Sequence, residues 1–252
     1  VHDSLNKRTE SREFALQAID ALKPLMAAPD PSVSLRRAYG LAMIYFGFSQ
    51  MRSDQEEMAV KSLEEARQAY RSIDGLQVGD LPSAAAYAEA SAWQVQALQA
   101  LARHDEARRV GEDAAGVAGR VLEKRPGHMG AIRARALIVD SLAGSEADTL
   151  HFGKAVALVE SGARDWEAIV KIDPSNQIAV NNLVNARLTS GFYSLRMGRI
   201  GDTLRQYRAA LAVERQAKPS AMIGSTLSIP AVGLVAVEAD LGNRQAAEAA
   251  LA

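Results

Sequence analysis

The chain has 252 residues, of which 48% are hydrophobic and 23% charged, a composition typical of a globular protein that buries most of its apolar surface. Its 29 basic and 30 acidic residues are mixed along the sequence, which argues against nucleic acid or an anionic membrane as a partner. No segment reaches the roughly 20 apolar residues of a membrane helix, and the lack of cysteine excludes disulfides while leaving the compartment, cytoplasm or periplasm, open.

Apolar residues recur at helical spacing along almost the whole chain, and short polar, glycine or proline segments interrupt them. Aromatic residues make up only 5%, so small and unbranched apolar residues dominate, which favours close helix packing over sheets. The pattern predicts an all-α protein with eleven helices, over residues 11–27, 33–51, 54–73, 82–102, 104–124, 128–143, 147–171, 175–197, 200–217, 222–241 and 243–252.

Both ends of the chain carry signals of their own. Residues 1–10 are polar and are expected to fray, and residues 245–252 form an alanine-rich helical pattern that the chain end cuts. The sequence also begins with valine, so we expect a fragment of a longer protein. Because the first and last helices lack a neighbour on one side, each is expected to expose an apolar stripe through which the protein self-associates.

The turns that join successive helices into antiparallel pairs are predicted near Ser53, His104, Gly144, Gly198 and Gly242. They are 51, 40, 54 and 44 residues apart, which is a long and irregular repeat. At the first of them, the serine and the glutamate three residues later predict a capping box that starts the next helix. Connections between pairs are short, so we expect a single domain over 1–252.

Two segments resemble a known repeat family. Residues 179–186, with Leu183, are similar to the first helix of a tetratricopeptide repeat (TPR), and residues 197–211, with Tyr207 and Ala210, resemble its turn and second helix. The resemblance implies a right-handed α-α superhelix, a TPR-like solenoid of antiparallel helix hairpins. It also implies a concave groove, lined by the first helices, that binds a peptide or protein partner.

Four polar residues are the candidates for partner binding. Asn181 and Asn185 are four residues apart and share a helix face, and Asn182 lies beside them. The resemblance places these positions in the groove, together with Arg133 on the preceding first helix, which offers a cation to a carboxylate. The alternatives stay open that the amides cap or bridge neighbouring helices and that the arginine is an ordinary surface residue.

No motif for catalysis or cofactor binding is recognisable. The four histidines are isolated, and Gly153-Lys154 lacks the other residues of a phosphate-binding loop. Ser4 and Lys7 have the spacing of a Ser-x-x-Lys motif, which arises often by chance. We therefore expect no catalytic residues, no metal and no cofactor.

These observations favour a protein-interaction scaffold or sensor module that is part of a larger bacterial signalling or regulatory protein. Two alternatives remain open. An RNA-binding helical-repeat protein predicts a basic groove and a regular code of residues in each repeat. An all-α enzyme domain predicts a facing pair of acid and base residues, which the sequence does not offer.

Overall fold

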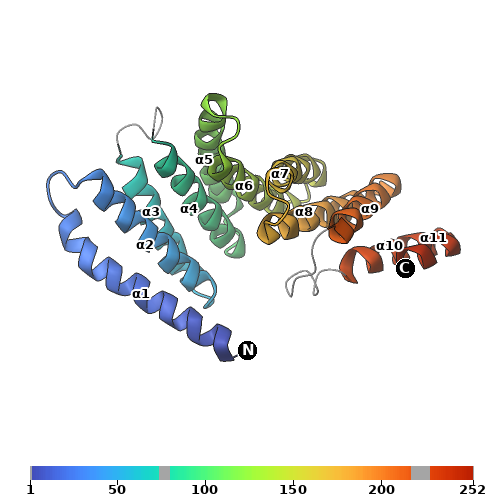
Figure 1. Ribbon diagram of the computed structural model, residues 1–252, viewed down its shortest axis with the longest axis horizontal. Helices are drawn as coiled ribbons and strands as arrows, with labels where there is room; N and C mark the ends of the chain where they lie inside the picture. The colour runs from blue at the N-terminus through green and yellow to red at the C-terminus, as the bar shows by residue number, and fades with distance from the viewer. Residues whose placement is uncertain (1, 74–79, 217–227, 252) are drawn as a thin grey trace. The chain divides into compact units, whose positions relative to one another are not determined.

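The computed structural model describes residues 2–73, 80–216 and 228–251, and in these ranges the protein is all-α with no strand (Figure 1). The helices are α1 (His2–Met26), α2 (Val33–Met51), α3 (Glu56–Arg71), α4 (Leu81–Ala100), α5 (His104–Lys124), α6 (Met129–Asp148), α7 (Phe152–Ile172), α8 (Gln177–Arg196), α9 (Ile200–Gln216), α10 (Ser228–Asp240) and α11 (Arg244–Leu251). Each corresponds to one helix of the sequence analysis, which confirms the all-α fold class.

The largest difference at a helix start concerns α1. This helix begins at His2, nine residues before its predicted start at residue 11, and the expectation that residues 1–10 fray stays a prediction. No glycine or proline interrupts the chain before Pro24, which favours a continuous helix over this range. At the other end of the chain, residues 222–227 of the tenth predicted helix lie outside the described residues.

Contacts divide the chain into two compact units, residues 1–141 and 142–252, and the division falls within α6. In the first unit α1 packs on α2, α2 on α3, α3 on α4 and α4 on α5, and α2 also contacts α4. In the second unit α7 packs on α8, α8 on α9, α9 on α10 and α10 on α11. Sequential packing of helices is thus shown in both units, and the expected single domain remains a prediction.

Five turns share one backbone conformation. A residue with positive φ follows the first helix of each hairpin: Asp54, Ala102, Leu150, Gly198 and Gly242. At the third turn the amide of Leu150 donates to the carbonyl of Ala147 (2.9 Å) and that of His151 to Glu146 (2.8 Å), which is the Schellman pattern of a helix end. The first four positions (54, 102, 150, 198) follow one another at steps of 48 residues, and the last step is 44.

The predicted irregular repeat was therefore wrong. The turn placed at Gly144 lies at Leu150, because α6 continues through that glycine to Asp148. Glycine is the usual residue in a left-handed turn position, so its presence in the first-helix pattern suggested a helix end that does not exist. The capping box was also wrong, since Ser53 donates to the carbonyl of Ser49 (3.0 Å) and α3 begins after Gln55.

Small residues occupy the same place in each hairpin. Five residues after the first four turns lie Ala59, Ala107, Ala155 and Thr203, all completely buried. A small side chain at this position lets the second helix approach the first closely, which is how hairpins of this kind pack. In the first hairpin a second close contact is made from the other helix, where a β-carbon at Gly47 would overlap the side chain of Leu63.

The first unit exposes an apolar groove between α1 and α2. It has a volume of about 550 Å³, and the exposed side chains of Phe14, Leu41 and Tyr45 line it. The groove supplies the expected apolar surface at α1, while self-association through it remains a prediction. In the described part of the chain, no helix is long and apolar enough to cross a membrane.

The turn geometry predicts that Leu150→Gly stabilises the protein. Leu150 has φ +63° and an exposed side chain, so glycine removes left-handed strain of about 1 kcal/mol without loss of a buried contact. We expect a higher midpoint of urea unfolding. Ala157→Gly, at an exposed position inside α7, is the control and should destabilise by about 1 kcal/mol; equal effects of the two changes would contradict the prediction.

Candidate functional site

A row of polar side chains runs along one face of α8. Asn181, Asn185 and Thr189 follow one another at four-residue steps, with Asn182 beside the first. Asn182 and Asn181 are half-buried and Asn185 is exposed. No hydrogen bond joins these three asparagine side chains to any other described residue, so their amides are available to a partner.

The row leads into an apolar cavity. Its volume is about 680 Å³, and residues of α8, α9 and α10 line it: Leu188, Thr189, Phe192, Tyr193, Tyr207, Val232 and Gly233. Phe192 and Val232 are exposed at its edge. A cavity of this size accommodates a large apolar side chain or a small ligand.

Two glycines determine the shape of this cavity. A β-carbon at Gly191 of α8 or at Gly233 of α10 would lie closer than 3 Å to the ring of Tyr207, which projects from α9. The glycines thus let both helices close on the buried ring, and the ring joins them. Burial raises the pKa of Tyr207, so its phenol stays neutral at physiological pH.

Arg133 occupies the position in α6 that Asn181 has in α8, since the two are 48 residues apart, one step of the repeat. Its guanidinium lies 3.4 Å from the carboxylate of Glu89 on α4, and about half of its side chain is exposed. It belongs to the first unit, and the asparagines belong to the second.

Sequence reasoning did not identify the cavity. Tyr207, which carries part of the resemblance, is buried. The missed residues Phe192, Val232 and Gly233 come from α8 and α10, which α9 separates in the chain. Gly191 was the available signal. It lies twelve residues before the buried Thr203 of the next helix, and Gly47 has the same spacing from the buried Ala59.

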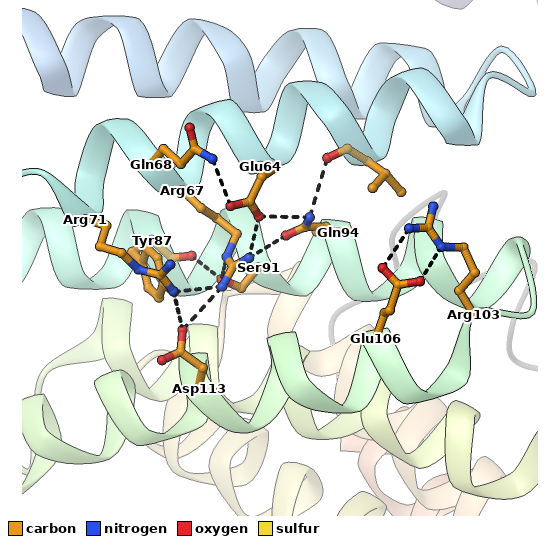
Figure 2. Close-up of polar contacts among 11 residues, drawn as sticks. Glu64, Arg67, Gln68, Arg71, Tyr87, Ser91, Gln94, Arg103, Glu106 and Asp113 are labelled. Atoms are coloured by element: carbon orange, nitrogen blue, oxygen red, sulfur yellow. Dashed lines mark hydrogen bonds and ion pairs between the residues drawn. The ribbon is translucent and has the colours of Figure 1, made fainter.

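The most extensive buried polar network lies in the other unit, between α3, α4 and α5 (Figure 2). Arg67 is only 5% exposed. Its guanidinium donates to five side chains at 2.7–3.3 Å: Glu64, Tyr87, Ser91, Gln94 and Asp113. All five of its N–H groups can therefore be satisfied, which a buried guanidinium requires.

Tyr87 is the centre of this network. Its hydroxyl accepts from Arg67 (2.8 Å) and Arg71 (2.6 Å) and donates to Asp113. Burial, together with the hydrogen bond to the aspartate, raises the pKa of Tyr87. Burial alone would raise the pKa of Asp113, but the hydrogen bond from the phenol and the charges of both arginines outweigh it and hold that pKa below its usual value.

Part of the network repeats. Tyr39 donates to Glu65 (2.7 Å), and these residues precede Tyr87 and Asp113 by one 48-residue step each. The phenol–carboxylate pair thus joins the two helices of both hairpins. Because each member already has its partner within the protein, the network is suited to fixing helices and not to proton transfer with a substrate.

The described residues contain no group of three or more histidine, aspartate or glutamate side chains placed to hold a metal ion. At the turn between α6 and α7, Nδ1 of His151 lies 3.0 Å from the carboxylate of Glu146 and 3.1 Å from the hydroxyl of Thr149. His104 and His128 are each at the start of a helix, and the ring of His128 accepts from the amide of Ala131 (3.1 Å).

No protein-family model matches this chain, and no curated protein matches its sequence. Among solved structures it is similar to the crystal structure of BtubC (BKLC) from P. vanneervenii, with a TM-score of 0.72 and 16% sequence identity. The match covers 96% of this chain and 87% of that one. At this identity the similarity shows a shared helical fold and nothing about function.

The network predicts that Arg67→Met destabilises the first unit by about 3 kcal/mol, because the change leaves buried acceptors without a donor. Urea unfolding followed by circular dichroism measures the effect. Arg120→Met, at an exposed arginine of α5, is the control and should change the stability by less than about 0.5 kcal/mol. Similar losses in both variants would show that the network does not stabilise the fold.

The lowered pKa of Asp113 predicts that the stability of the protein depends on pH. Since its pKa is lower in the folded protein, it contributes stability above the unfolded pKa of about 3.9 and loses that contribution as pH falls through the folded value. Asp113→Asn should therefore be less stable at pH 7, with a shallower fall in stability towards pH 3. Asp105→Asn, at an exposed residue of the same helix, should follow the parent protein; parallel curves for all three proteins would refute the prediction.

Proposed function

We propose that the protein is a binding module that holds an extended peptide, or such a segment of a partner protein, along α8. Asn181, Asn182 and Asn185 bind the peptide backbone, and an apolar side chain of the peptide enters the cavity beside Phe192. The observation that carries this proposal is the row of unpaired amides that leads directly into an apolar cavity of about 680 Å³.

The chemistry of the surface supports a peptide. A primary amide donates and accepts at once, as a peptide bond does, so asparagines spaced by one helical turn match a backbone without regard to its sequence. The cavity then supplies selectivity, because a buried apolar anchor contributes much of the affinity of such complexes. Among the described residues that line it, none is a carboxylate, lysine, arginine or histidine, so we propose a large uncharged residue as the anchor.

We further infer that the hairpins are TPR-like and continue as a right-handed superhelix whose first helices line the groove. The resembling segments, the repeated Schellman turns and the buried small residues support this interpretation. The 48-residue step is longer than the family's period of about 34 residues. By analogy with such arrays, the module belongs to a larger bacterial signalling or regulatory protein and is not itself an enzyme.

The test is selection of peptides from a random phage-displayed library on the immobilised protein, followed by fluorescence anisotropy with the selected peptides. Two variants address the two parts of the surface. Replacing Asn181, Asn182 and Asn185 by alanine should weaken binding at least tenfold, since two or more hydrogen bonds are lost. Val232→Arg, which places a cation at the cavity edge, should reduce binding to a similar extent.

The control replaces Gln17 and Gln245 by alanine, because these exposed amides lie outside both the row and the cavity. It should bind like the parent protein. Circular dichroism checks that all variants keep their helices. Selected peptides that bind the parent and the asparagine variant equally would show that the row is not the binding surface.

A further inference from the structure

A second cavity lies in the same unit and shares no lining residue with the first. It occupies about 570 Å³ between α7, α8 and α9. Most of its wall is apolar and includes Val170, Val180, Leu183 and Ala209. Two cationic side chains, Lys171 and Arg187, also line it.

The repeat explains why this space is empty. Two 48-residue steps earlier, the corresponding positions in α3, α4 and α5 hold the residues of the polar network. Leu183 stands where Tyr87 does, Ala209 where Asp113 does, and Ala163 where Arg67 does. Tyr87 and Asp113 are thus replaced by the smaller apolar residues Leu183 and Ala209, which both line the cavity, and the volume that the larger side chains would occupy is open.

Arg187 supplies a cation beside this volume. Its side chain is 23% exposed, and it donates to Gln206 (3.2 Å) and to Glu167 (3.0 Å), a carboxylate that is mostly in solvent. Lys171 is exposed on the same wall and forms no ion pair within the described residues. With two cations and one carboxylate on its wall, the cavity favours a negatively charged ligand.

We propose that this cavity binds small carboxylic acids with an apolar body about the size of an aromatic ring. The ligand's carboxylate pairs with Arg187 and Lys171, the two cations on the cavity wall. Its ring fills the space that the Tyr87 side chain occupies two repeats earlier, against Val180, Leu183 and Ala209. The site does not depend on the proposed peptide-binding surface, since the two cavities have separate walls.

Isothermal titration calorimetry with three probes of equal shape tests the proposal. Phenylacetate should bind the protein, whereas the neutral phenylacetamide and the cationic phenethylamine should bind at least tenfold more weakly. Equal binding of the three probes, or no binding of phenylacetate, would overturn the proposal.

Two variants locate the site. Arg187→Gln should weaken phenylacetate binding about tenfold, and Arg187→Lys should keep most of it. Ala209→Leu fills the cavity without touching a charge and should also weaken binding about tenfold, while Ala236→Leu, at an exposed alanine of α10, should not. Ala209→Leu keeps the proposal falsifiable if the arginine variant fails to fold, and binding that neither variant weakens refutes it.

Discussion

The close approach of the two helices in each hairpin is the constraint on which the rest of the structure depends. Ala59, Ala107, Ala155 and Thr203 are completely buried at the same distance after their turns, and a larger side chain there would separate the helices. The turn sets that distance, because its left-handed residue ends one helix and begins the next within a few residues. The common turn and the common contact give each hairpin the same internal register, and the lengths of the helices and connections set the 48-residue step.

This constraint also explains which parts of the fold were predictable. Helical periodicity is a local property, so the sequence indicated all eleven helices and the all-α class. The period was misjudged because Leu150 and Ala102 adopt a left-handed conformation in which glycine is expected, while Gly144 lies inside α6. A hairpin held by its buried contacts tolerates strain of about 1 kcal/mol at one exposed residue, and composition alone does not reveal which residue carries it.

The candidate site, like the fold, was predictable from the sequence only in part. The asparagines follow from helical spacing and from the resemblance, and the register places Arg133 one step before Asn181. The cavity that gives the asparagines a role depends on Tyr207 and Gly233, which are distant in sequence and meet only when α9 packs on α10. Contacts between hairpins depend on three helices at once, and a pattern read along one helix does not contain them.

Because the backbone repeats, equivalent spaces between neighbouring hairpins can hold side chains of different chemistry. Where Tyr87, Asp113 and Arg67 complete one another, removing any one leaves buried polar groups unpaired, so the members of such a set are replaced together. Leu183, Ala209 and Ala163 occupy these three positions in the second unit, while Arg187, Gln206 and Glu160 form a separate polar group beside them. Because each hairpin packs mainly on its neighbours, the loss of packing in one such space stays local. An array of this kind can therefore fill one space between hairpins with a stabilising polar network and leave another open to a ligand, without changing the path of the chain.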